Sequence, residues 1–293
     1  MHLLYANIIT IKECSVVAVS ILIQSDACKA RLVGEGVIAP LIRILESGSC
    51  VAKKKAAEAL LALTVDSEKE SIHLELNQIL GICHCNHGQH IDKENASAIT
   101  GYGGLSALVE NCKYGSPEGL AIGSAVLRNL AFVEEIRGPM VEEGAIPVLI
   151  NFVNCGATLA QESSAECLYL LAANHENLRQ RICIEGGVEC LVSFLEKAPR
   201  AEAQEIALRA IHSLSASIYS ISFLMSSGFV RQLKGLLKSG CVEIQELAAL
   251  CICNLSKTEE TNRAVGEAGC IGLLAKMLYG KSSFSQAIAA RAH

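Results

Sequence analysis

The chain has 293 residues, a net charge of −5, no tryptophan and a hydrophobic content of 51%. It lacks the clustered basic charge of a nucleic-acid-binding protein, so nucleic acid is not an expected partner. Its fourteen cysteines follow no regular framework, so we expect free thiols in a reducing compartment rather than a disulfide scaffold.

A glycine recurs along the chain with the same apolar residues around it. Taking each such glycine as position zero, the spacings are 67, 41, 42, 42 and 41 residues. An apolar residue stands four before and two after every glycine, and a leucine stands five after it. These offsets predict one buried helix face per unit. The glycines are Gly36, Gly103, Gly144, Gly186, Gly228 and Gly269, and the leucines are Leu41, Leu108, Leu149, Leu191, Leu233 and Leu274.

The predicted helix ends at a second glycine, usually twelve residues after the first, which we expect to take a left-handed C-terminal cap. A longer helix follows. We number it from one residue, the ladder position, which is followed by leucine in all six copies. Six residues before it stands a small residue, which permits close packing against another helix. The ladder positions are Ile21, Ala62, Asn129, Leu170, Ser213 and Asn254.

The two ends of the chain fall within repeats. Projecting the period back from Ser15 places the first glycine before Met1. At the other end, the small-residue position falls at Ala289, close to His293. We therefore expect partial repeats at both ends. Because an exposed face between repeats is apolar, we expect the chain either to be an interior segment of a longer array or to be completed by a partner.

The 67-residue spacing contains a segment without the repeat pattern. Removing residues 70–93 restores an ordinary spacing, so we predict a loop insertion there within a single domain spanning residues 1–293. The insertion holds a group of thiols and imidazoles, namely Cys83, His84, Cys85, His87 and His90. Zinc sites usually show two separated ligand pairs, which this group lacks, so we expect no metal site.

These features resemble the armadillo repeat over almost the whole chain. The resemblance implies an all-α fold, a right-handed α-solenoid (superhelix) of five full repeats with partial repeats at both ends. Three stretches are similar to plant armadillo-only proteins, akin to vacuole-associated armadillo scaffolds. They are Met140 to Gly144, Leu159 to Leu168, and Val265 to Ile271.

The resemblance also implies a concave groove lined by the long helices. Peptide-binding members usually carry asparagine at the ladder position, whose amide can both donate and accept. Nuclear-import adaptors add a tryptophan four residues earlier, which this chain lacks, so import-signal recognition is not expected. The implied groove residues are Glu58, Arg128, Asn129, Glu166, Tyr169, Arg209, His212 and Asn254. An ordinary solvent-exposed helix face is the alternative for each.

No phosphate-binding loop, nucleophile elbow or paired catalytic carboxylates are recognisable, so we expect no enzyme activity, cofactor or small-molecule substrate. The leading hypothesis is a non-catalytic scaffold that binds a protein or peptide partner. The alternative is the substrate-recognition part of a U-box ubiquitin ligase, with its catalytic module outside this sequence. Docking to a membrane is suggested only by analogy. The expected location is the cytoplasm, with the nucleus or a membrane surface as alternatives.

Overall fold

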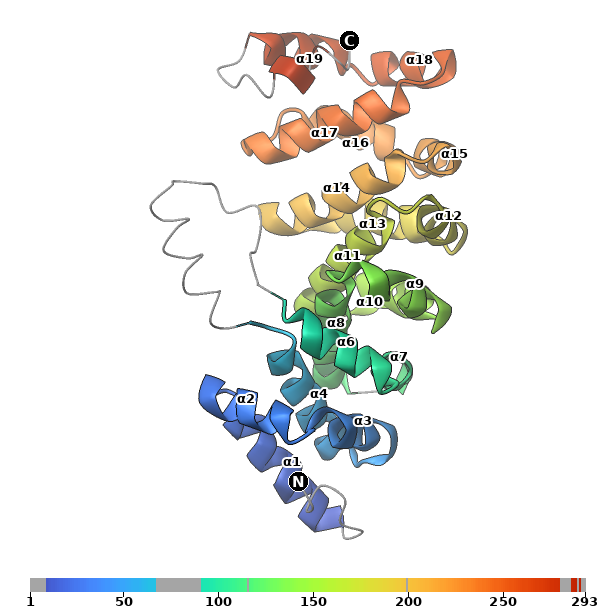
Figure 1. The fold of residues 1–293 in the computed structure, drawn as a ribbon. Coiled ribbons are helices and arrows are strands. Elements are labelled where there is room, and N and C mark those ends of the chain that lie inside the picture. The colour runs from blue at the N-terminus through green and yellow to red at the C-terminus, as the bar shows by residue number, and fades with distance from the viewer. Residues whose placement is uncertain are drawn as a thin grey trace. The chain divides into compact units, whose positions relative to one another are not determined.

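The computed structural model describes residues 9–66, 91–114, 116–198, 200–279, 286–288 and 290. The secondary structure of these residues is helical, apart from one isolated antiparallel bridge between Val65 and Ile91. The helices recur in sets of three, a short first helix, a second helix and a longer third helix (Figure 1). The predicted all-α repeat fold is therefore confirmed.

The described residues contain five complete sets, or layers, preceded by α1 (Ile9–Leu22) and followed by α18 (Glu259–Glu267) and α19 (Ile271–Leu278). The other first helices are α2 (Asp26–Gly34), α6 (Lys93–Gly101), α9 (Glu134–Glu142), α12 (Glu176–Ile184) and α15 (Ile218–Ser226). The second helices are α3 (Ile38–Ser47), α7 (Gly104–Tyr114), α10 (Ala145–Cys155), α13 (Gly187–Lys197) and α16 (Phe229–Leu236). The third helices are α4 (Cys50–Leu63), α8 (Pro117–Ala131), α11 (Thr158–Ala172), α14 (Ala201–Ser215) and α17 (Val242–Leu255).

The chain divides into two compact units, Met1–Val148 (unit 1) and Leu149–His293 (unit 2). In unit 1, α4 packs between α1 and α8, and in unit 2, α14 packs between α11 and α17. The small residues predicted at these contacts are buried in α4, α8, α11, α14 and α17. Their short side chains allow neighbouring helices to approach closely.

The six repeating glycines separate each first helix from the second helix. All six have positive φ, between 75° and 88°, a conformation that costs other residues energy because their Cβ crowds the backbone. The leucine five residues after each glycine is at most 1% exposed in every copy. The recurring glycines thus mark the turns and the recurring leucines mark the core, as predicted.

At the three positions that the structure describes, the second glycine of a unit does not take the predicted left-handed conformation, while Gly115 and Gly280 lie outside the described residues. Gly48 has φ −77° and ψ 168°, and neither Gly156 nor Gly240 has a positive φ. A Cβ on Gly48 would lie 2.6 Å from the Ile44 carbonyl oxygen, and one on Gly156 would lie 2.5 Å from that of Phe152. Glycine at these two positions therefore permits the chain to pass close to the preceding helical turn.

The cap of α6 bears on where the predicted insertion ends. Each first helix is preceded by a cap residue eleven positions before the repeating glycine, and Asp92 occupies this position for α6. The Asp92 carboxylate accepts a hydrogen bond from the Asn95 backbone N at 2.9 Å, and the Asp92 N donates to the Thr64 carbonyl at 3.0 Å. Asp92 and Lys93 therefore belong to the repeat and not to the insertion. Residues 67–90, with the cysteines and histidines from which no metal site is expected, lie outside the described residues.

Two predicted core positions are exposed near the ends of the chain. Leu22 is 49% exposed and Ile271 is 53% exposed, whereas the other leucines that follow the ladder position are at most 1% exposed. No helix among those described combines the length and the apolar character needed to cross a bilayer. The twelve cysteines within the described residues are free thiols.

Candidate functional site

The predicted groove residues of unit 1 lie on α4 and α8. Glu58 is half-buried and pairs with Lys55, Oε2 to Nζ, at 2.7 Å. Arg128 is half-buried, and its Nε and Nη2 lie 3.1 and 2.8 Å from the side-chain oxygen of Asn129. The charged groove residues predicted in unit 1 are therefore one acidic and one basic side chain, each with a partner on its own helix.

Asn129 was expected to be exposed, but it is fully buried. Its Nδ2 donates to the Thr64 hydroxyl at 2.8 Å, and its Oδ1 accepts from Arg128. The Thr64 hydroxyl in turn donates to the Leu61 carbonyl at 2.7 Å. Because both ends of the amide are engaged within the chain, Asn129 connects α8 to the end of α4.

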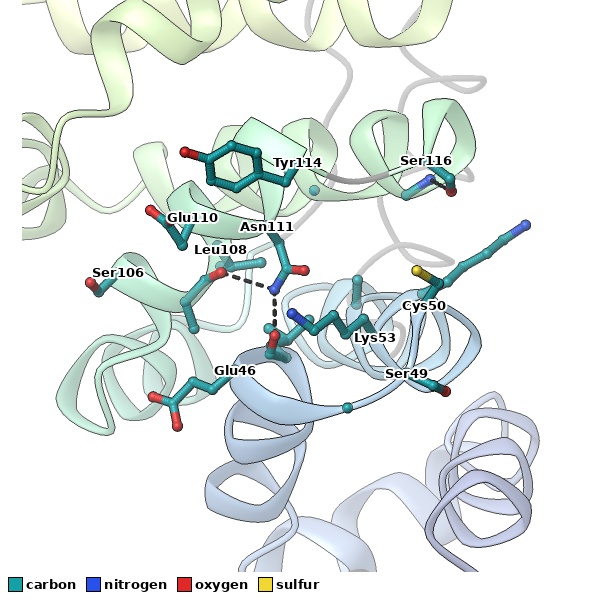
Figure 2. Close-up of a pocket in the computed structure, with 17 residues that line it drawn as sticks. Glu46, Ser49, Cys50, Lys53, Ser106, Leu108, Glu110, Asn111, Tyr114 and Ser116 are labelled. Carbon is teal, nitrogen blue, oxygen red and sulfur yellow. Dashed lines mark hydrogen bonds between the residues drawn. The ribbon is translucent and has the colours of Figure 1, made fainter. Parts of the chain in front are cut away.

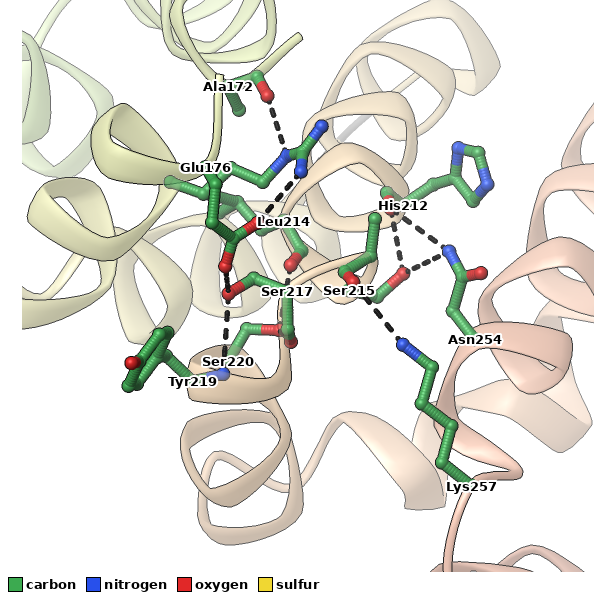
Figure 3. Close-up of polar contacts among 12 residues, drawn as sticks. Ala172, Glu176, His212, Leu214, Ser215, Ser217, Tyr219, Ser220, Asn254 and Lys257 are labelled. Atoms are coloured by element: carbon green, nitrogen blue, oxygen red, sulfur yellow. Dashed lines mark hydrogen bonds and ion pairs between the residues drawn. The ribbon is translucent and has the colours of Figure 1, made fainter. Parts of the chain in front are cut away.

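Asn254 makes the equivalent connection in unit 2, where Figure 3 shows it between α17 and the end of α14. Its Nδ2 lies 3.0 Å from the Ser215 hydroxyl and 3.5 Å from the His212 carbonyl oxygen. Ser215 Oγ also donates to that carbonyl at 2.7 Å. Asn254 is half-buried, so this ladder residue retains some contact with solvent.

The other predicted residues of unit 2 are all half-buried. Glu166 and Tyr169 lie on α11, while Arg209 and His212 lie on α14. The structure brings Tyr169 and Arg209 together, with the guanidinium carbon 4.7 Å from the ring centroid. This distance is that of a cation–π contact. Burial lowers the pKa of His212 below its ordinary value, so the imidazole is neutral at pH 7.

Polar side chains that the sequence analysis did not single out connect each third helix to the next first helix. In one kind of junction, a side chain three residues after the cap donates to the carbonyl of the leucine that follows the ladder position. The pairs are Asn95 Nδ2 to Leu63 (3.0 Å), Ser220 Oγ to Leu214 (2.7 Å) and Thr261 Oγ1 to Leu255 (2.6 Å). These bonds satisfy carbonyls that a helix end leaves without an internal partner.

In the second kind of junction, an arginine four residues after the cap takes over this role. Arg137 Nε donates to the Ala131 carbonyl and Arg179 Nε to the Ala172 carbonyl, each at 2.8 Å. Arg179 also pairs with Glu176, which accepts a hydrogen bond from Ser217 (Figure 3). The hydrogen bond from the Ser217 hydroxyl, and to a smaller extent Arg179, holds the pKa of Glu176 below its usual value.

The kind of junction correlates with the residue that stands two positions after the ladder position. Thr64, Ser215 and Ser256 stand there in the first kind, and alanine stands there in the second. The Thr64 and Ser215 hydroxyls are also the groups that Asn129 and Asn254 contact. The sequence shows these residues recurring at fixed offsets. It does not show that the asparagine of one layer bonds the hydroxyl of the preceding layer, some 40 or more positions earlier.

A cavity of about 630 Å³ lies in unit 1, between the α3–α4 and α7–α8 pairs. Figure 2 shows Lys53 and Asn111 near its centre, Glu46 and Glu110 to one side, and Ser49 and Ser116 to the other. Asn111 donates to the Leu45 carbonyl at 2.7 Å. The lining carries both signs of charge and so selects no single class of ligand.

The described residues include potential metal ligands and cysteine thiols. No group of three or more histidines, cysteines, aspartates or glutamates placed to hold a metal ion occurs within them. Burial raises the pKa of Cys112 and of Cys190 to about 12 and that of Cys183 to about 11. These thiols stay protonated at neutral pH, which is the opposite of what a nucleophilic cysteine requires.

The fold defined by these layers is an α-solenoid of armadillo repeats. Solved structures of designed armadillo repeat proteins are similar to the chain. One, YIII(Dq)4CqI, is 22% identical, with a TM-score of 0.70 over 87% of this chain and 98% of that one. A second, computationally designed for modular peptide recognition, is 20% identical, with a TM-score of 0.73 over the same shares.

A third designed armadillo repeat protein, solved in complex with the peptide (KR)4, is 21% identical. Its TM-score is 0.69, over 87% of this chain and 97% of that one. No protein-family model matches the sequence. No curated protein matches it either. At these sequence identities the similarity supports a shared fold and nothing further.

Proposed function

We propose that the protein is a non-catalytic scaffold that binds a protein or peptide partner along its third helices. One observation carries the proposal. In unit 2, α11, α14 and α17 pack in succession. The first two helices present half-buried side chains at two matching positions, Glu166 with Arg209 and Tyr169 with His212, and α17 presents the half-buried Asn254. Such side chains, partly shielded from water, are the kind that contribute most to protein interfaces. Designed proteins of this fold have been made for peptide recognition, which supports the same use here.

The test is capture of partners by the full chain, followed by their identification by mass spectrometry. In the test variant, Glu166, Tyr169 and Arg209 are all changed to alanine. The control variant carries Glu189→Ala and Glu196→Ala, two exposed substitutions on the second helix α13. Circular dichroism checks that both variants keep the helical fold.

We expect the test variant to lose a specific partner at least about tenfold, equivalent to 1.4 kcal/mol, and the control to retain it. Equal retention by the test variant, or equal loss from both folded variants, would refute the assignment of the binding face.

We also propose that the protein works in the cytoplasm. The free thiols, many of them buried among apolar helices, support a reducing compartment. Fractionation of cells that express the full protein tests this proposal, and recovery with the secreted or luminal fraction would contradict it.

A further inference from the structure

One exposed serine of unit 1 directly precedes a proline. Ser116 and Pro117 are the only serine or threonine followed by proline in the sequence. Ser116 is the N-cap of α8, and its backbone is extended, with φ −69° and ψ 157°. An exposed serine in extended backbone before proline is the substrate that proline-directed serine/threonine kinases recognise.

The first turns of α8 are weakly held, which makes Ser116 accessible to an enzyme. The Ser116 hydroxyl accepts one hydrogen bond, from the Gly119 backbone N at 3.3 Å. Gly119 and Gly123 both lie near the start of α8, and glycine is among the least favourable residues within a helix. This end of α8 can therefore unwind at low cost and present Ser116 to an active site.

Two lysines of α4 line the same cavity as Ser116. Lys53 and Lys54 are both half-buried there. Within the part of the chain that the structure describes, neither side chain makes a hydrogen bond or an ion pair, whereas Lys55 pairs with Glu58 at 2.7 Å. Cations that are partly removed from water and have no counter-ion interact strongly with an anion placed beside them.

The acidic side chains that line this cavity lie away from Ser116. Figure 2 shows Glu46 and Glu110 on one side of the cavity and Ser116 on the other. Glu110 is already paired with Lys113 at 3.0 Å. Glu118, the carboxylate nearest to Ser116 in the sequence, is exposed, and water weakens its repulsion of an anion. A negative group on Ser116 would therefore be favoured by the lysines on this side of the cavity.

We infer that Ser116 is a phosphorylation site for a proline-directed serine/threonine kinase, and that Lys53 and Lys54 hold the phosphate at the N-terminus of α8. The γ-phosphoryl group of ATP passes to Ser116 Oγ. The Oγ–P bond forms, the bond between Pγ and the ADP oxygen breaks, and the hydroxyl proton goes to the catalytic base of the kinase.

The phosphate would connect two neighbouring third helices. It carries a charge of about −1.5 to −2 at pH 7. Its oxygens can accept hydrogen bonds from the first N–H groups of α8 and pair with the lysines of α4. The site belongs to unit 1, whereas the side chains that support partner binding belong to unit 2, so the two proposals can be tested separately.

The first test treats the full chain with a purified proline-directed serine/threonine kinase, ATP and Mg²⁺. Intact-mass spectrometry and fragment mapping locate the phosphate. The site variant is Ser116→Ala. Its matched control is Ser106→Ala, at another exposed serine of the cavity lining that is not followed by proline. We expect the wild type and the control to gain one phosphate, on Ser116, and the site variant to gain none. No transfer to the wild type, or equal transfer to the site variant, would overturn the inference.

A second measurement tests the lysines. The test variant is Lys53→Gln with Lys54→Gln, and the control is Lys238→Gln with Lys276→Gln, at two exposed lysines of unit 2. Both variants lose the same charge, and circular dichroism checks that both keep the helical fold.

Phosphorylation should raise the melting temperature of the wild type and of this control by about 1–3 °C. The Lys53→Gln, Lys54→Gln variant should lose at least about half of this gain, because its glutamines cannot pair with the phosphate. A fall in the melting temperature of the phosphorylated wild type, or an equal gain in all three proteins, would overturn the role of the two lysines.

Discussion

The side-chain amide of Asn254 bonds the end of the preceding third helix, as the amide of Asn129 does in unit 1. A buried or half-buried polar group contributes to stability when its partner is present, and leaving it without one is costly. These two asparagines therefore stabilise the contact between layers. The armadillo pattern alone would assign them to ligand binding instead.

A double-mutant cycle measures the Asn254–Ser215 contact. We expect Asn254→Ala and Ser215→Ala each to lower the free energy of unfolding, with a coupling energy of about 0.5–1.5 kcal/mol between them. Guanidinium denaturation of both single variants and the double variant gives this value. Combining Asn254→Ala with Ser213→Ala, at the ladder position of α14, serves as the control, and additivity in both cycles would contradict the link.

The glycines also allow a matched comparison within one layer. Gly228 has a φ of 83° and open space around a built Cβ, so Gly228→Ala meets a conformational penalty but no clash. We expect it to destabilise the chain by about 1 kcal/mol. Gly235 lies within α16, also in open space, and Gly235→Ala should stabilise by up to about 1 kcal/mol. Thermal melts of the two variants should shift in opposite directions, and shifts of the same sign would contradict this account.

Helices, their buried faces and the turns between them were predictable because these features recur at fixed offsets. The column of leucines headed by Leu41 is an example, since burial of one member implies burial of the rest. The role of Gly48 was not predictable. A glycine that is needed because a Cβ would clash with a nearby carbonyl oxygen looks the same in sequence as a glycine that caps a helix in the left-handed conformation. The Asn254–Ser215 contact escaped prediction for a different reason: it joins two layers, and its meaning depends on a residue in the neighbouring helix.

The start of α6 provides a test of where the insertion ends. Deleting residues 66–91 keeps Asp92 and its bonds to Asn95, whereas deleting residues 70–93 removes this cap. We expect both variants to fold, and the first to be more stable by about 1 kcal/mol because a helix N-cap is worth that amount. Chemical denaturation followed by circular dichroism compares them. Greater stability of the second variant would show that Asp92 is dispensable.

Stability of the chain should also depend on pH in a way that follows from its buried groups. The pKa of His212 is lowered in the folded state, so below about pH 6.5 the unfolded state takes up a proton that the folded state resists. The free energy of unfolding should fall as the pH drops from about 7 towards 5. In the His212→Gln variant this part of the fall should be absent. An unchanged slope in that variant would show that His212 is not its source.

The two kinds of junction have a consequence for how an array of this type can change its length or order. A layer that ends in Thr64 or Ser215 is matched to a following layer that supplies both a polar residue near its cap and a ladder asparagine. A layer that ends in Ala131 or Ala172 is matched instead to one that supplies an arginine. Duplication or shuffling of layers preserves these bonds only when the end of one layer meets a following layer that supplies its matching side chains. Chemical compatibility between adjoining modules thus determines which rearranged descendants of this chain would keep the stabilisation that these bonds provide.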